Sequence, residues 1–252
     1  MKRKTFIPVN NNIDKAIAFA NSLSQDYLKG VQKLEQKQFY VPSLEVVSNL
    51  QQKGWEINGV YEHRGSNRKI TSNFIQMYHP DFSMRNIKNQ IEALSSLTIS
   101  NSCSGNKPMT INMGAYRLVC SNGLIRYEKH AEETKIKHVE VDYNRLPQIL
   151  ELIDRNKEKV LEEFNLLKNR NLTEEEARQF TIQSIRLANR EVTNPRVEEM
   201  LRVHRMEDEG MNLWNVFNRV QENLTGGMVN MNENIRVNEQ LTALANQYAI
   251  AI

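Results

Sequence analysis

Cysteine is scarce in this chain of 252 residues, which contains only Cys103 and Cys120. The two do not form a CxxC pair, so the sequence predicts neither a disulfide framework nor a zinc site. No apolar run approaches the roughly 18 residues of a membrane-spanning helix. The basic start, Met1–Lys4, leads into polar residues and not into the apolar core of a signal peptide. These absences predict a globular protein of a reducing cytoplasm that has no membrane partner.

The motifs of common catalytic classes are also missing. The chain has no GxxxxGK[ST], GxGxxG, GxSxG or HExxH pattern, which removes the usual signs of ATP-driven, dinucleotide-dependent, esterase and zinc-protease chemistry. The five histidines do not have the spacing of metal ligands. The acidic run Glu174–Glu176 falls at an expected helix start, where carboxylates favour the helix dipole. The sequence therefore predicts no catalytic residue, no metal site and no cofactor.

The charge that is present is unevenly distributed. The net charge is +3, but Lys and Arg outnumber Asp and Glu over residues 1–147, whereas acidic residues predominate in the rest. Most of the aromatic residues also lie in the basic part. Basic and stacking side chains thus come from the same segment, as a nucleic-acid surface requires. An excess of lysine is equally typical of an ordinary solvated face.

Hydrophobic periodicity first predicts helices. Apolar residues at helical spacing indicate an amphipathic helix over residues 12–38. A shorter helix is expected in VPSLEVVSNLQQKGW, with Pro42 near its start and Gly54 as a left-handed cap. From Trp55 the period changes to two, which predicts an antiparallel meander.

The expected strands of this meander follow one another along the chain. Residues 55–78 predict a hairpin, LTISNSCSG and MTINMGAYRLVC predict two more strands, and KIKHVEV is a candidate for another. Residues 81–95 fit neither a strand nor a helix clearly. From Tyr143 the helical period returns, and Thr173 with Glu176 has the pattern of a capping box. Further helices are expected to start at Asn194 and Asn212.

The predicted fold class is therefore α+β, with N-terminal helices, an antiparallel β-meander and a helical C-terminal part. Residues 1–142 are expected to form the mixed core of helix and antiparallel sheet. Residues 143–252 are expected to form the helical part, packed on the same unit.

The stretch GAYRLVCSNGLI at residues 114–125 alternates like a strand and then becomes polar. Asn122 and Gly123 tolerate positive φ, so a tight turn is expected there. Cys120 is expected to be a buried structural thiol, since no histidine is tied to it in sequence. Such a turn either locks the fold or gathers N–H groups around an anion, and periodicity leaves both open.

Several segments, in the same order, resemble a family of phage and plasmid proteins that carry a domain of unknown function. They are VPSLEVVSNLQQKGW, NSCSG, GAYRLVCSNGL, KHV and LWNVFNRVQENLTGG followed by IRVNEQLTALA, and they span about Val41 to Ala245. The family usually has Asn-Ser-His-Asp-Gly where this chain has NSCSG, so Cys103 and Ser104 depart from the pattern and argue against His-Asp chemistry. The resemblance implies a mobile-element protein of a bacterial host's cytoplasm, with a structural signature of Asn101, Gly105, Cys120, Asn122, Gly123, Trp214 and Asn218.

The order of the expected elements also resembles the phage single-strand annealing proteins and their Rad-fifty-two-like relatives. Annealing needs no ATP, but it needs cations along the phosphates and aromatic rings for the bases. The resemblance implies a homo-oligomer that binds single-stranded DNA in recombination or replication. The candidate contacts are Arg64, Arg68, Lys69, Arg85, Lys88, Arg117 and Lys137 for phosphates and Tyr61 and Tyr78 for bases.

Two other functions stay open. An anti-defence or host-takeover protein that binds a host protein fits the phage resemblance and the acidic C-terminal part. An unrecognised nuclease or other enzyme is the third hypothesis, although paired carboxylates at the ends of neighbouring strands are not evident.

Overall fold

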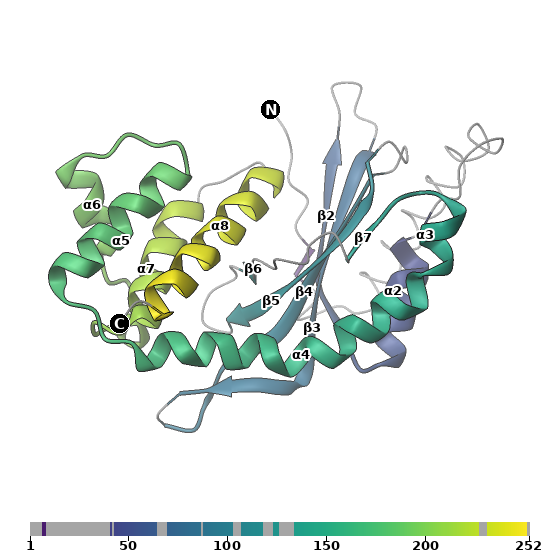
Figure 1. Cartoon of the computed structure of the whole chain (residues 1–252), viewed down its shortest axis with the longest axis horizontal. Coiled ribbons are helices and arrows are strands. Elements are labelled where there is room, and N and C mark those ends of the chain that lie inside the picture. The colour runs from purple at the N-terminus through teal and green to yellow at the C-terminus, as the bar shows by residue number, and fades with distance from the viewer. Residues whose placement is uncertain are drawn as a thin grey trace.

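The computed structural model describes residues 7–8, 41, 43–64, 70–86, 88–102, 107–117, 123–125, 134–226 and 231–250. Its strands are β1 (Ile7–Pro8), β2 (Glu56–Arg64), β3 (Ile70–Arg85), β4 (Ile91–Ser102), β5 (Met109–Arg117), β6 (Gly123–Ile125) and β7 (Lys135–Ile136). Its helices are α2 (Ser43–Gln52), α3 (Glu140–Asn144), α4 (Leu146–Asn169), α5 (Glu174–Leu187), α6 (Asn194–Leu201), the 3-10 turn η2 (Met206–Asp208), α7 (Leu213–Thr225) and α8 (Met231–Ile250). The predicted α+β class is confirmed (Figure 1). The helix predicted over residues 12–38 lies outside the described residues.

The sheet is an antiparallel meander in the order β1-β2-β3-β4-β5-β6, and β7 also pairs with β5. The predicted hairpin and the two strands after it are confirmed as β2, β3, β4 and β5. Residues 81–95 were ambiguous in sequence because a register shift between His79 and Ser83 interrupts the two-residue period of β3. The strand then continues to Arg85.

The segment KIKHVEV forms less strand than its sequence indicates. Only Lys135 and Ile136 pair with β5, and α3 begins at Glu140. The cause lies in the polar contacts of this segment: the Lys137 N–H donates to the Asp142 carboxylate at 2.8 Å, so the backbone turns away from the sheet towards α3.

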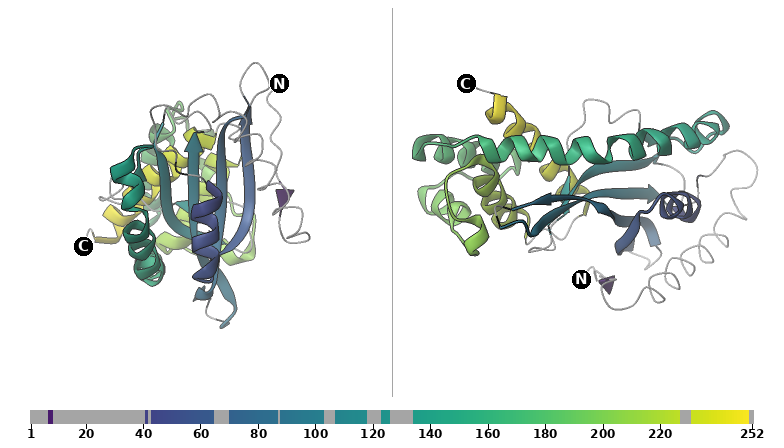
Figure 2. Two further views of the ribbon diagram at one scale, coloured as in Figure 1. Left: turned by 90° about the vertical axis from the view of Figure 1, so that its right-hand side faces the viewer. Right: turned by 90° about the horizontal axis from the view of Figure 1, so that it is seen from below.

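The two faces of the sheet differ in chemistry. Side chains directly opposite one another in an antiparallel pair share a face, and one face is apolar in its two central rows, Ile75–Ile99–Ile111 and Met77–Leu97–Met113. Helix α4 crosses this face and packs on β3, β4 and β5 (Figure 2). The apolar core between them contains Ile75, Met77, Leu97, Ile99, Ile111 and Met113 from the sheet and Ile149, Ile153, Val160, Leu161 and Phe164 from α4. Antiparallel sheets are commonly apolar on one face and polar on the other.

Helices α5, α6, α7 and α8 gather beside one end of the sheet, whereas α2 and α3 lie at the other end (Figure 1). Helix α7 packs on α4, α5, α6 and α8. The predicted capping box is confirmed: Thr173 accepts from the Glu176 N–H, and the Glu176 side chain accepts from the Thr173 N–H. Asn212 caps α7, as predicted. The largest apolar cluster contains residues of both the sheet and these helices. None of the described helices is long and apolar enough to span a membrane.

The turn between α2 and β2 confirms the predicted cap at Gly54, whose φ is +90°. A Cβ atom built at this position would lie 2.9 Å from the His79 Nε2 atom. That nitrogen is 3.0 Å from the Lys53 carbonyl oxygen, so the ring has little freedom to move away. Only glycine meets both the backbone and the packing requirement here.

Replacing Gly54 by alanine is expected to lower the free energy of unfolding by about 1–3 kcal/mol, because an L-residue is strained at this φ and the new methyl group contacts His79. Urea denaturation followed by circular dichroism measures the effect. Ser48→Ala on the exposed side of α2 is the control and is expected to leave stability unchanged or slightly raised. Equal midpoints for Gly54→Ala and the wild type would contradict this explanation of the turn.

Candidate nucleic-acid interface

The sheet face turned away from α4 carries polar side chains in rows across several strands. One row contains Gln76, Thr98 and Asn112, from β3, β4 and β5, and a neighbouring row contains Ser100 and Thr110 together with Phe74 of β3, which is buried. Thr98, Ser100, Thr110 and Asn112 are half-buried, whereas Gln76 is only 6% exposed. We call this surface the polar face, defined by Gln76, Tyr78, Ser96, Thr98, Ser100, Thr110, Asn112 and Tyr116.

Two tyrosines stack on the polar face. Tyr78 of β3 and Tyr116 of β5 have ring centroids 6.3 Å apart and an angle of 24° between their planes. The rings meet over β4, where Ser96 pairs with Tyr78 on one side and with Gly114 on the other. A small serine and a glycine without a side chain leave the room that this approach needs. The result is a pair of half-buried aromatic rings beside a row of amides and hydroxyls.

The Tyr78 hydroxyl donates to the Glu56 carboxylate, with the two oxygens 2.5 Å apart. Burial raises the pKa of Tyr78 to about 12, and the hydrogen bond and negative charge of Glu56 act in the same direction. The phenol therefore stays neutral over the physiological range. The hydrogen bond holds the hydroxyl oxygen in place, and the stacking contact with Tyr116 constrains the plane of the ring.

The predicted DNA contacts have different surroundings. Tyr78 lies on the polar face, Arg85 and Lys88 are exposed at the turn between β3 and β4, and Lys137 is exposed after β7. Arg117 is only 1% exposed and points to the apolar side of the sheet, so a surface phosphate does not reach it. The strand pattern around Arg117 does not indicate that this side chain is buried.

The other predicted residues are described in part. Tyr61 and Arg64 belong to β2, but their side chains are outside the described part of the structure. Arg68 and Lys69 lie outside the described residues, as do three signature residues, Gly105, Cys120 and Asn122. Gly123 begins β6 and pairs with Tyr116 of β5, so Gly123 itself is a strand residue. The tight turn predicted at Asn122 and Gly123 stays a prediction, because residues 118–122 lie outside the described part of the chain.

Arg117 belongs to a buried ionic cluster that joins the sheet to the C-terminal helices. Its Nη2 atom is 2.8 Å from the Asp208 carboxylate of η2 and 4.0 Å from the Glu92 carboxylate of β4. Lys168 of α4 and the Trp214 indole of α7 both donate to Glu92, at 2.6 Å and 2.5 Å. We call these five residues the ionic cluster. Asn218, also a signature residue, lies next to it, with its side-chain amide donating to the Trp214 carbonyl oxygen at 2.8 Å.

A second polar connection fixes the chain before α2. The backbone N–H of Val41 donates to His138 Nδ1 at 3.1 Å, and the Val41 carbonyl oxygen accepts from Asn101 Nδ2 at 3.0 Å. Because Nδ1 accepts, the proton of neutral His138 sits on Nε2, which lies 3.0 Å from the Lys107 carbonyl oxygen. Burial lowers the pKa of His138 below its ordinary value of 6.5. The sequence signature Asn101 and the KHV segment thus meet at Val41.

This geometry predicts acid-dependent stability. A folded-state pKa below the unfolded value means that the contribution of neutral His138 is complete above about pH 6.5 and is lost as the pH falls towards the folded pKa. His138→Asn, which offers an amide oxygen as acceptor and does not titrate, is expected to weaken the decline of Tm below pH 6.5. Thermal melts from pH 5 to pH 8 measure it. Parallel pH profiles for both proteins would rule out His138 as the cause.

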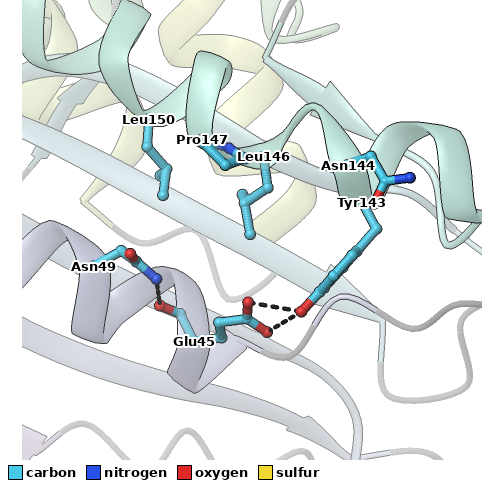
Figure 3. A pocket seen from close by; sticks show the side chains of 7 residues that line it. All are labelled: Glu45, Asn49, Tyr143, Asn144, Leu146, Pro147 and Leu150. Carbon is cyan, nitrogen blue, oxygen red and sulfur yellow. Dashed lines mark hydrogen bonds between the residues drawn. The ribbon is translucent and has the colours of Figure 1, made fainter.

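The cavity between α2 and the start of α4 has a volume of about 230 Å³ and is shown in Figure 3. The Tyr143 hydroxyl donates to both oxygens of the Glu45 carboxylate, at 2.8 and 3.0 Å, and the Asn49 side chain donates to the Glu45 carbonyl oxygen. These polar groups therefore bond to one another and tie α2 to α3. Within the described part of the chain, no three His, Cys, Asp or Glu side chains are grouped as metal ligands.

Sequence reasoning missed most of the polar face. Tyr116, Thr98 and Asn112 alternate with buried apolar residues in LTISNS and MTINMGAYR, which is the signal that could have identified them. Gln76 carried the same signal in β3. The alternation predicts each strand, whereas the chemistry of the outer face depends on the register between strands.

Comparison with known proteins identifies one family. The family described as Domain of unknown function (DUF932) matches residues 35–245, which is most of the chain. No curated protein and no solved structure matches the chain significantly. The chain therefore belongs to the DUF932 family.

Proposed function

We propose that this member of the DUF932 family binds single-stranded DNA without catalysing a reaction, and that it promotes annealing in the recombination or replication of a phage or plasmid. The observation that carries the proposal is the polar face with its stacked Tyr78–Tyr116 pair. Single-strand binding proteins combine aromatic rings for the bases with cations along the backbone. Exposed cations are present at both ends of the sheet, with Arg85 and Lys88 at one end and Lys107 and Lys137 at the other.

The proposal also covers the oligomeric state and the cellular location of the protein. Annealing proteins present an extended strand along a ring or filament, so we propose a homo-oligomer acting in the cytoplasm of a bacterial host. The reaction itself needs no nucleotide hydrolysis, because base pairing supplies the free energy. A host protein as the partner is the alternative.

Removing either ring tests the proposal directly. Tyr116→Ala and Tyr78→Ala are each expected to weaken binding to an oligothymidine by about 1–3 kcal/mol. The slope of log affinity against log salt is expected to stay unchanged, because no phosphate contact is removed. Fluorescence anisotropy over a salt series measures both quantities.

The matched control is Tyr248→Ala on α8. Its ring packs edge-on against Phe180 in the helical part, 5.3 Å between centroids, and not on the polar face. Circular dichroism verifies that each variant is folded. If Tyr248→Ala weakens binding as much as Tyr78→Ala and Tyr116→Ala do, the polar face is not the binding surface.

A further inference from the structure

The interior of the polar face is uncharged. In the rows that cross β2 to β7, the charged side chains among the described residues are Glu56 and Lys135, which lie at opposite edges of the sheet. Between them the face displays the amide of Asn112 and the hydroxyl of Thr98, paired directly across adjacent strands, whereas Gln76 in the same row is only 6% exposed and its Oε1 atom accepts from Asn58. Neighbouring strands are about 4.8 Å apart, so these groups form a closely spaced row.

This chemistry fits one part of a nucleic acid better than the other. A phosphate needs a cation or several N–H donors, and the described side chains in the interior of the polar face include no cation. An unpaired base is neutral, has a flat ring for stacking and carries amide-like donors and acceptors on its edge. Asn and Gln side chains match such edges with one donor and one acceptor each. The complementarity in charge is therefore with bases.

We infer that the polar face holds a single strand by its bases, with Tyr78 and Tyr116 stacking on their rings and Thr98 and Asn112 bonding to their edges. The phosphates then face solvent and the cations beyond the ends of the sheet, among them Lys107 and Lys137. This inference rests on the proposed function and adds the mode of binding to it.

Binding of the strand by its bases has a consequence for annealing. Bases in a duplex are stacked and paired within the helix, so their rings and pairing edges are closed to the polar face. A strand leaves the face as it pairs with its complement, and the duplex product is released. The face thus selects single strands by the state of their bases and not by their charge.

Two oligonucleotides of equal length and charge test the inference with the wild-type protein alone. One is fluorescein-labelled oligothymidine, and the other is a labelled abasic oligomer with tetrahydrofuran in place of each nucleoside. The wild type is expected to bind oligothymidine at least about 10-fold more tightly, the effect of one stacked base. Variants refine the result: Asn112→Ala and Thr98→Val are expected to weaken binding to oligothymidine and to leave binding to the abasic oligomer unchanged.

Asn165→Ala, an exposed asparagine of α4 on the other side of the sheet, is the control and is expected to change neither affinity. Equal affinity of the wild type for the two oligomers would overturn the inference and leave DNA binding itself intact, since phosphates alone would then account for it. Absence of binding to both would overturn the proposed function together with the inference. The two failures are therefore distinguishable in one titration.

Discussion

Replacing Asp208 by alanine is expected to lower the free energy of unfolding by about 3–5 kcal/mol, the cost of leaving a buried charge without its partner. Asp208 and Arg117 are each 1% exposed, and their side chains are 2.8 Å apart. Without the carboxylate, the Arg117 guanidinium keeps Glu92 at 4.0 Å as its nearest remaining counter-charge, and Glu92 already accepts from Lys168 and Trp214. Urea denaturation measured by tryptophan fluorescence gives the change.

Two further variants separate charge from packing. Glu207→Ala, at the exposed neighbouring position, is expected to leave stability within about 0.5 kcal/mol of the wild type. The double variant Arg117→Met with Asp208→Leu removes both charges and is expected to recover much of the stability lost by Asp208→Ala, because apolar replacements of a buried pair are often neutral. A single Asp208→Ala protein that unfolds at the wild-type midpoint would show that the ionic cluster does not hold the sheet to the helices.

The second large effect is expected at Phe217. This side chain is fully buried in α7, within the apolar cluster that α7 shares with α4, and its ring centroid lies 6.3 Å from that of Trp214. Phe217→Ala is expected to cost about 3–5 kcal/mol through lost burial and a residual cavity. Leu166→Ala, 58% exposed on α4, is the control and is expected to cost little.

The mass of the Phe217→Ala protein in solution provides a second measurement. Light scattering of the Phe217→Ala protein shows whether the loss appears as unfolding or as a change in mass. Unchanged mass together with an unchanged unfolding midpoint would mean that α7 does not depend on this contact. A lower midpoint at constant mass would place the effect inside one chain, as the burial of Phe217 indicates.

The sequence predicted well those features that depend on residues close together along the chain. The Thr173–Glu176 capping box, the Asn212 cap and the positive φ of Gly54 each involve a few consecutive residues, and all are present. The two-residue period of MTINMGAYR likewise identified β5. Local steric and hydrogen-bond rules are sufficient for such features.

Features built from distant residues could not be predicted in this way. Arg117 meets Asp208 across 91 positions and Trp214 meets Glu92 across 122, so no local pattern connects them. A lone arginine in a strand is usually exposed, which is why Arg117 was assigned to phosphate binding. The pairing of Tyr78 with Tyr116 depends on the register of three strands, and that register was not available from periodicity.

The same distinction applies to the candidate site. Tyr78 was identified because aromatic residues in a basic segment suggest stacking, yet its partner Tyr116 was not. The polar face became visible only when the strand pairing placed Gln76, Thr98 and Asn112 in one row. A face is a property of the assembled sheet, whereas each strand contributes only every second residue.

The central claim, that the protein binds single-stranded DNA in preference to duplex DNA, is tested most directly by titrating the wild-type protein into a labelled oligothymidine and into a labelled duplex of the same length, each at two salt concentrations. The expected result is tighter binding to the single strand at both concentrations, with some weakening at the higher salt from the cations at the ends of the sheet. No binding to the single strand at low salt, or equal binding to single strand and duplex, would contradict the claim, and a protein partner would then become the leading explanation.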